Sequence, residues 1–154
     1  MGDKAPDFTL TARSGEKVSL KDFVGKKDIV LYFYPKDFTP GCTQEACTFR
    51  DSYEEFRDEG AEVIGISSDT KDSHSMFALH YKLPFILLSD EDGAVRKLYG
   101  VPKTFGMLPG RTTYLIDVNG VVRYIFSSQF MPGRHRDEAL KALRNIHREF
   151  KKAV

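Results

Sequence analysis

An unbroken apolar run that ends at a proline constrains this chain more than any other feature. Residues 29–34 read IVLYFY, and a short series of β-branched and aromatic side chains is typical of a strand buried on both faces of a sheet. Pro35 ends the run, and Pro40 stands where the first position of a helix tolerates proline best. The stretch therefore predicts a buried strand, a turn and then a helix, which is the start of a β-α-β unit.

The segments that follow continue this alternation. The helix from Pro40 to Gly60 is predicted to bury Phe49, Tyr53 and Phe56, which share one helical face. Strands are also expected at residues 61–67 and 86–88, helices at 71–81 and 137–152, and hairpins about Ser14-Gly15 near the N-terminus and about Asn119-Gly120. Strands that alternate with helices and end in an antiparallel hairpin predict one α/β domain, with a central mixed sheet, over residues 1–154.

Local patterns predict further details of these elements. Asp69, followed three residues later by Asp72, resembles a capping box at the start of the helix at 71–81. The side chains of that helix expected to point inward are Met76, Phe77 and Leu79 or His80. Residues 101–110 and 129–136 lack periodicity and are expected to be loops, and the first of them can border a functional site.

The helix that begins near Pro40 carries both cysteines of the chain. Thr39 offers a hydroxyl at the N-cap position, so Cys42 falls in the first turn. Backbone N–H groups there have no partner within the helix, and the aligned peptide dipoles favour negative charge. Because this location stabilises a thiolate, which is the reactive form of cysteine, Cys42 is a candidate nucleophile.

Cys47 follows Cys42 by five residues, and helix geometry limits what the two can do together. Positions five apart in a helix are rotated by about 140°, and their Cα atoms lie roughly 8 to 9 Å apart. A disulfide needs Cα atoms within about 7 Å and Cβ vectors that converge. Joining Cys42 to Cys47 would therefore require at least the first turn to unwind, so that chemistry and local unfolding would be coupled.

Two less reactive roles are open for these cysteines. Cysteine is more often a small buried hydrophobe than a catalyst, and Cys47, close to Phe49, could be such a core residue. A structural zinc site is the other alternative, but a lone C-x4-C pair supplies only half of the ligands, so His74 and His80 would have to complete it. Cys42 lies in a turn away from any apolar stripe, which favours the reactive role.

The overall charge argues against a polyanionic partner. The chain has 23 Lys and Arg against 22 Asp and Glu, and a net charge of +1 gives no field that would recruit nucleic acid or an acidic membrane. No segment reaches the roughly 18 to 20 apolar residues of a membrane span, and the N-terminus lacks the apolar core of a signal peptide. We therefore expect a cytoplasmic protein with a small or uncharged substrate. The alternative is the mature form of an organellar protein, such as a plastid one.

The string FYPKDFTPGCTQEAC, residues 33–47, resembles the active-site segment of the peroxiredoxins. Their pattern of a proline, three residues, a threonine, two residues and a cysteine is matched by Pro35, Thr39 and Cys42. The second cysteine, five residues later, is similar to the bacterioferritin-comigratory-protein or peroxiredoxin Q branch. The resemblance runs from APDFTL near the N-terminus through LPGRTTYLIDVNGVV to the last helix, and it implies a thioredoxin-like fold.

The resemblance also implies an activity, that of an antioxidant thiol peroxidase for hydrogen peroxide and alkyl hydroperoxides. It makes Cys42 the peroxidatic cysteine and Cys47 the resolving cysteine, which form an intramolecular disulfide. Pro35 and Thr39 become pocket residues, and Arg111 becomes the arginine of the site. It further implies thioredoxin or a similar dithiol as the reductant and a monomeric protein. No metal or cofactor is required, and the chain contains neither a GxGxxG nor a Walker motif.

Two other functions stay open at this point. A general thiol-disulfide oxidoreductase also uses a cysteine at a helix N-terminus, although its usual C-x-x-C spacing is absent from this chain. A redox-switched binding or chaperone-like module could use the disulfide to open the helix and expose apolar surface. Stoichiometric consumption of peroxide separates the peroxidase from both.

Overall fold

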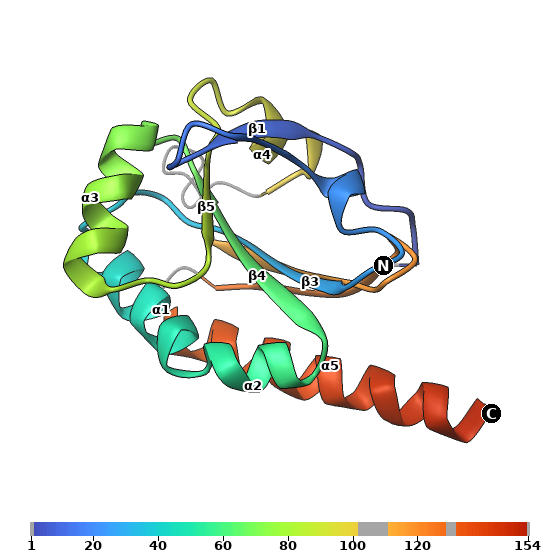
Figure 1. Ribbon diagram of the computed structural model, residues 1–154. Helices are drawn as coiled ribbons and strands as arrows, with labels where there is room; N and C mark the ends of the chain where they lie inside the picture. Colours follow the sequence, from blue (N-terminus) through green and yellow to red (C-terminus); the bar gives the residue numbers. More distant parts are fainter. Residues whose placement is uncertain (1, 102–110, 129–131, 154) are drawn as a thin grey trace.

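The computed structural model describes residues 2–101, 111–128 and 132–153, and contains a seven-stranded sheet flanked by helices (Figure 1). The strands are β1 (Thr9–Ala12), β2 (Lys17–Ser19), β3 (Asp28–Phe33), β4 (Ala61–Ser67), β5 (Ile86–Ser89), β6 (Thr112–Ile116) and β7 (Val122–Ser127). The helices are α1 (Pro40–Asp51), α2 (Tyr53–Asp58), α3 (Lys71–Tyr81), α4 (Ala94–Leu98) and α5 (Pro132–Ala153), with one 3-10 turn at Leu20–Asp22. This order confirms the predicted α/β class.

The sheet is mixed and its strands lie in the order β2-β1-β5-β4-β3-β6-β7. β3 pairs with β4, and β4 with β5, in parallel, whereas the other pairs are antiparallel. The N-terminal hairpin β1–β2 extends the sheet beyond β5, as expected, and the second predicted hairpin is β6–β7. Parallel pairing of β3 with β4 makes β3-α1-α2-β4 the β-α-β unit that the sequence predicts.

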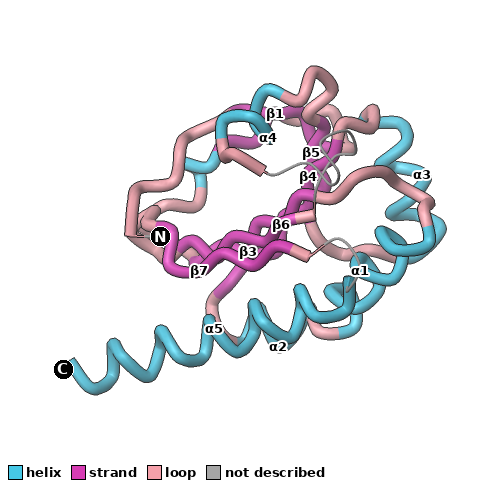
Figure 2. Tube along the Cα trace, turned by 180° about the vertical axis from the view of Figure 1, so that it is seen from behind, coloured by secondary structure: helices cyan, strands magenta, loops and turns pink. Residues whose placement is uncertain are grey.

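Both faces of the sheet are covered, so β3 is buried on each side. Val30 and Tyr32 pack into the core under α1, α2 and α5, whereas Ile29 and Leu31 pack into a second core on the opposite face. Figures 1 and 2 show α1, α2 and α5 along one face, with α4 and the β1–β2 hairpin on the other side of the molecule. The double burial predicted from IVLYFY is confirmed.

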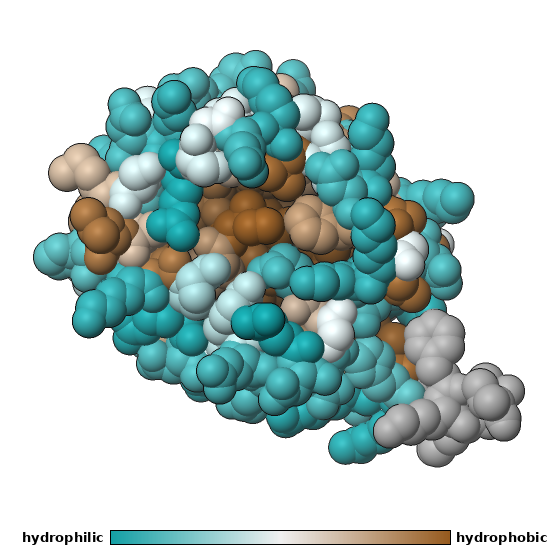
Figure 3. All heavy atoms as spheres, viewed as in Figure 1, coloured by the Kyte–Doolittle hydropathy of each residue, from teal (hydrophilic) through white to brown (hydrophobic). Residues whose placement is uncertain are grey.

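Helix α3 turns inward a face that matches the predicted one only in part. His74, Phe77 and Ala78 are its buried residues, whereas Met76 is 66% and Leu79 is 81% exposed. The prediction is confirmed for Phe77 and wrong for Met76, Leu79 and His80. Apolar residues occupy both faces of this helix, so their spacing alone does not select the core side. Hydrophobic atoms consequently reach the surface at the left edge of Figure 3, where α3 lies in Figure 1.

Helix boundaries also differ from the predicted ones. The N-cap of α3 is Thr70, whose hydroxyl accepts a hydrogen bond from the Ser73 N–H, and not Asp69. The helix predicted from Pro40 to Gly60 is divided at Ser52, whose φ of −107° and ψ of 9° are not helical. Serine favours such interruptions because its hydroxyl offers the backbone alternative partners.

The last helix, α5, begins five residues earlier than predicted, at Pro132. Residues 132–136 look like a polar loop in the sequence, but proline is preset for the first helical turn and His135 is buried by tertiary contacts. Within the part of the chain that the structure describes, no helix is both long enough and apolar enough to cross a membrane. The predicted loop at residues 101–110 lies, from residue 102 on, outside the described residues.

Candidate active site

Cys42 is the third residue of α1 and lies in its first turn, as the sequence predicts. The residue is only 1% exposed and belongs to the core beneath α1, together with Tyr32, Tyr34 and Ala46. The sequence predicted that Cys42 lies away from any apolar stripe, and that prediction was wrong. Because the sulfur is buried, only small molecules can reach it, and each neighbouring charge acts on it more strongly than it would in water.

Thr39 is the N-cap residue of α1, but its hydroxyl does not cap the helix. The hydroxyl donates a hydrogen bond to the carbonyl of Lys36 at 2.8 Å, which closes the turn between Pro35 and the helix. Phe38, inside this turn, has a φ of 65°, a left-handed conformation that is uncommon for a bulky residue. Contacts on both sides of Phe38 must therefore hold the turn in place.

Arg111 lies next to Cys42 although 69 residues separate them in sequence. The residue is buried just before β6, and its guanidinium donates a hydrogen bond to Oε1 of Glu45 at 2.7 Å and interacts electrostatically with Cys42. Burial lowers the pKa of Arg111, but the charges and hydrogen bonds of Glu45 and Cys42 outweigh burial and raise the pKa. A permanently charged donor thus faces the candidate nucleophile.

Gly41 allows this close approach. A Cβ atom at this position would lie 3.0 Å from Nη2 of Arg111, closer than an ordinary van der Waals contact. The guanidinium therefore lies directly against the backbone of the first turn of α1. A side chain at residue 41 would therefore displace the guanidinium from this position.

Arg96 is a second cation near Cys42, and it was not among the site residues predicted from the sequence. It comes from α4 on the other side of the sheet, and its guanidinium donates a hydrogen bond to the Tyr34 carbonyl at 2.6 Å and lies over the ring of Phe33. Burial lowers the pKa of Arg96, while the charges of Asp90, Cys42 and Tyr114 oppose that effect. In the sequence Arg96 resembles an ordinary cation on a short helix, and no local signal connects it with Cys42.

Two further buried ionisable groups, Glu45 and His135, were also missed. Glu45 is fully buried, and burial raises its pKa to about 8 although Arg111 opposes the shift. His135, from α5, is fully buried as well, and its Nδ1 lies 3.5 Å from Oε2 of Glu45. Burial lowers the pKa of His135 to about 4, opposed by its hydrogen bond to the Ser128 carbonyl. The only sequence signal was the position of Glu45 three residues after Cys42.

Cys47 is half-buried further along α1, and both cysteines are free thiols. The helix is continuous from Pro40 to Asp51, so the geometric estimate of roughly 8 to 9 Å between their Cα atoms applies. Cys42 is buried in the core while Cys47 is not, in keeping with the rotation of about 140° between them. The wound helix holds the two thiols apart.

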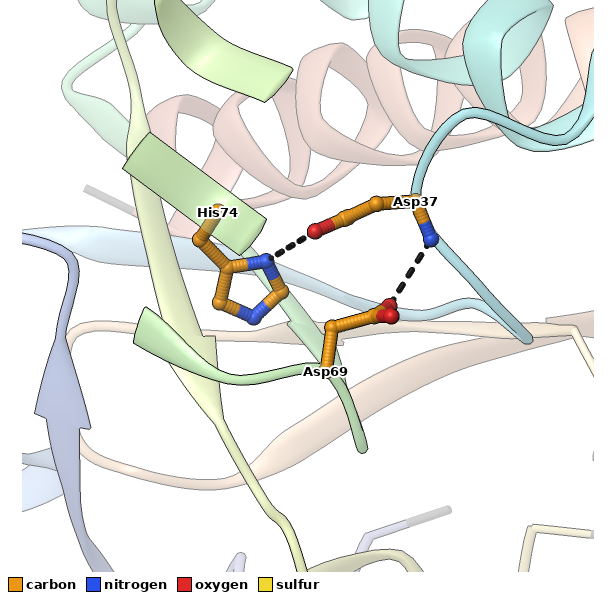
Figure 4. Close-up of side chains that lie close together, drawn as sticks. All are labelled: Asp37, Asp69 and His74. Carbon is orange, nitrogen blue, oxygen red and sulfur yellow. Dashed lines mark hydrogen bonds and ion pairs between the residues drawn. The ribbon is translucent and has the colours of Figure 1, made fainter. Parts of the chain in front are cut away.

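Asp37, Asp69 and His74 form a cluster beside the turn that precedes α1 (Figure 4). Their ligand-type atoms lie within 4.8 Å of one another. The Asp37 carboxylate accepts hydrogen bonds from the Tyr34 and Ser73 hydroxyls, and its Oδ2 lies 2.8 Å from Nδ1 of His74. The other ring nitrogen of His74 faces the carbonyl of Leu88 at 3.0 Å.

This cluster is better suited to fixing the chain than to holding a metal. The remaining acid, Asp69, accepts hydrogen bonds from the Asp37 backbone N–H at 2.8 Å and from the Ser67 hydroxyl at 2.7 Å. A cation would have to displace the hydrogen-bond donors of Asp37 and Asp69 and the partners of both His74 nitrogens, so these three residues do not fit a metal site. The zinc alternative also needs His74, whose two nitrogens are both occupied. The cluster instead ties the turn before α1 to β4, α3 and β5.

Comparison with known proteins gives concordant results. Residues 1–125 match the model of the AhpC/TSA family. The protein named peroxiredoxin Q, chloroplastic, from Sedum lineare is 56% identical over 146 residues, which cover 94% of this chain and 78% of that protein.

Solved structures with similar sequences share the fold. The peroxidoxin BcpB from Mycobacterium tuberculosis superposes with a TM-score of 0.87 at 39% identity, over 94% of this chain and 96% of that one. Peroxiredoxin Q from Xanthomonas campestris gives a TM-score of 0.82 at 33% identity, over 90% of each chain. These superpositions confirm the thioredoxin-like fold expected from the sequence.

Proposed function

Since this chain belongs to the AhpC/TSA family, and within it to the peroxiredoxin Q branch, we propose that Cys42 is the sulfur with which it acts as a thiol-dependent peroxidase. The family and the thiol peroxidase activity implied by the sequence are confirmed. One observation supports the role of Cys42. Its sulfur lies in the first turn of α1 and interacts electrostatically with Arg111, whose guanidinium is held by a hydrogen bond to Glu45.

In the proposed reaction, the Cys42 thiolate attacks the nearer oxygen of hydrogen peroxide or an alkyl hydroperoxide. An S–O bond forms, the O–O bond breaks, and the departing oxygen leaves as water or an alcohol after it takes up the proton that the thiol released. Cys42 becomes a sulfenic acid, which is the first and reversible step of cysteine oxidation. Arg111 stabilises the negative charge that develops on the departing oxygen, because its donors are already fixed in place.

Thr39 and Pro35 are proposed to shape the pocket. The Thr39 hydroxyl uses its proton on the Lys36 carbonyl, so its oxygen is left to accept a hydrogen bond from the peroxide O–H. Pro35, half-buried at the start of the turn, would limit the access of water to the sulfur. Both roles depend on the turn that the Asp37 cluster holds.

Resolution is proposed to follow within the same chain. The Cys47 thiol attacks the sulfur of the sulfenic acid, an S–S bond forms, and water leaves. The helix must open first, because the wound form keeps the thiols apart. A dithiol reductant such as thioredoxin would then reduce the disulfide through a mixed disulfide. Resolution between two cysteines of one chain is compatible with a monomer.

The compartment and the domain count are also proposals. Sedum lineare peroxiredoxin Q is named a chloroplastic protein, which favours the plastid alternative over the cytoplasmic expectation for this chain. The two cores lie on opposite faces of one continuous sheet, which supports a single domain over residues 1–154.

Replacement of the two cysteines tests the proposed chemistry. We expect Cys42→Ser to abolish peroxide consumption, whereas Cys47→Ser retains one stoichiometric oxidation and loses turnover with thioredoxin. Stopped-flow measurement of peroxide, followed by mass spectrometry for a link between residues 42 and 47, checks both. Unchanged turnover of Cys42→Ser would contradict the assignment. Disulfide exchange without peroxide consumption would favour the oxidoreductase, and binding of partners only after oxidation, with negligible turnover, would favour the switched module.

A further inference from the structure

Glu45 has an unusual position for a buried carboxyl group. It lies between the two cysteines on α1, within the segment that must unwind before Cys42 and Cys47 can join. Its side chain is fully buried, and one oxygen, Oε1, accepts a hydrogen bond from Arg111. The group that orients the arginine of the site therefore belongs to the part of the helix that has to move.

The other oxygen of Glu45 is left without a hydrogen-bond donor. Among the described residues, Oε2 has no hydrogen-bond partner, and Nδ1 of His135 lies 3.5 Å from it. The Ser128 carbonyl can only accept, so the other ring nitrogen of His135 carries the proton. Nδ1 of the neutral ring then accepts from the Thr113 hydroxyl at 2.7 Å and offers Glu45 no proton.

The wound helix thus holds Glu45 in a place that disfavours its charge. Burial raises the pKa of Glu45 to about 8, and Arg111 opposes this only in part. In an opened α1 the carboxyl would meet water and have an ordinary pKa of about 4.3. A group whose pKa is raised in the closed state stabilises that state fully below the open-state pKa, and this stabilisation is lost as the pH rises through the closed-state pKa.

We propose that Glu45 is a positioning residue that serves both halves of the cycle: it orients Arg111 while α1 is wound, and its ionisation promotes the unwinding that brings Cys47 to Cys42. The first half follows from the hydrogen bond to Arg111, and the second from the unpartnered oxygen inside the moving segment. The inference rests on the proposed function, because the unwinding has a purpose only if the two cysteines react.

Besides the Cys42 thiol, three other ionisable side chains among the described residues face Glu45, and none of them titrates near neutral pH. They come from β3, the segment before β6, and α5, and they are Tyr32, Arg111 and His135. Burial raises the pKa of Tyr32 well above its ordinary value, the pKa of Arg111 is raised, and the pKa of His135 is lowered to about 4. In a chain without thiols, Glu45 is therefore the one group of this set that ionises between pH 6 and pH 8.

The test measures hydrogen exchange of the α1 amides in the full chain carrying Cys42→Ser and Cys47→Ser. After correction for the intrinsic exchange rate, protection reports the population of opened α1. A pKa of about 8 in the wound helix and of about 4.3 in the open helix predicts an opening equilibrium about fiftyfold larger at pH 8 than at pH 6. Adding Glu45→Gln should abolish this dependence, because an amide does not ionise.

A matched control separates Glu45 from other effects of pH. Glu62, on β4, is also buried but lies outside α1, so Glu62→Gln in the same background should keep the fiftyfold change. His74, His80 and His147 are present in every variant, so the comparison between Glu45→Gln and Glu62→Gln does not depend on them. A pH dependence of unchanged size with Glu45→Gln would overturn the proposal.

A second measurement needs no variant at Glu45. In the reduced, unmodified chain, the side-chain carboxyl carbon of Glu45 should titrate with a midpoint near 8 by NMR, and a midpoint below about 5 would overturn the proposal. Neither experiment depends on turnover of peroxide. If either experiment contradicts the role of Glu45, the proposed role of Cys42 is unaffected. Conversely, a chain that fails to reduce peroxide could still show the ionisation of Glu45 and its effect on α1.

Discussion

Two buried carboxyl groups, Asp37 before Cys42 in the sequence and Glu45 after it, differ in how many of their oxygens have hydrogen-bond partners. Asp37 accepts from the Tyr34 and Ser73 hydroxyls and lies against His74, so both of its oxygens are engaged. Glu45 has a hydrogen bond on one oxygen and none on the other. A fully satisfied group resists displacement, whereas a half-satisfied one loses little when it moves into water.

This difference separates a fixed end from a movable end at the active site. The turn that contains Phe38 and Thr39 is anchored through Asp37 to elements far along the chain. The first turns of α1 depend instead on Arg111 and on packing. In the proposed reaction, the turn before α1 would therefore keep its shape while the first turns of α1 open.

Removing the anchor is expected to have the greatest effect on stability. Asp37→Ala leaves the Tyr34 hydroxyl and His74 buried without their acceptor, and the free energy of unfolding should fall by about 3 kcal/mol. Urea denaturation measures this loss. Asp51→Ala, at an exposed position of α1, is the control and should change stability by less than about 0.5 kcal/mol. Equal losses in the two variants would show that Asp37 anchors nothing.

A methyl group at residue 41 tests the movable side. Gly41→Ala places a Cβ 3.0 Å from Nη2 of Arg111, so we expect the guanidinium to shift from its position beside Cys42. The rate of oxidation by peroxide should fall roughly tenfold, as expected when one donor to a developing charge is misplaced. Thermal stability should not fall, because alanine favours a helix over glycine by about 0.5 to 1 kcal/mol. Thr43→Ala is the control, and a Gly41→Ala rate equal to that of this control would contradict the contact with Arg111.

The far end of α5 offers a weaker version of the Asp37–His74 contact. His147 places one ring nitrogen 2.9 Å from Asp28 and the other 2.9 Å from Glu59, but its side chain is 30% exposed. Burial lowers the pKa of His147, but the hydrogen bonds and charges of Asp28 and Glu59 outweigh burial and raise it.

The sign of the pH effect at His147 follows from that raised pKa. The paired imidazolium stabilises the fold fully below the ordinary histidine pKa of about 6.5, and this contribution disappears as the pH rises through the raised value. His147→Gln should cost less than about 1 kcal/mol at pH 5.5 and almost nothing at pH 9. Thermal denaturation of both proteins at the two pH values measures the loss of stability caused by His147→Gln. A larger loss at pH 9 than at pH 5.5 would contradict the pairing.

Features that depend on neighbours in sequence were predicted well. The run from Ile29 to Tyr34 identified β3, Pro40 marked the first residue of α1, and the hairpin about Asn119-Gly120 is β6–β7. The position of Cys42 in the first turn and its spacing from Cys47 were likewise readable, because a helix fixes these relations locally. The loop expected at residues 101–110 is still a prediction, because residues 102–110 lie outside the described part of the chain.

Features that depend on distant contacts were decided only by the tertiary structure. Arg111 was recognised by resemblance, whereas Arg96, Glu45 and His135 were missed, because α4, α1 and α5 meet at Cys42 only after the sheet has assembled. The burial of Cys42 and the exposure of Met76 and Leu79 on α3 were predicted wrongly for the same reason. Periodicity shows that a helix has an apolar side, but solvent exclusion and the local electric field depend on what packs against it.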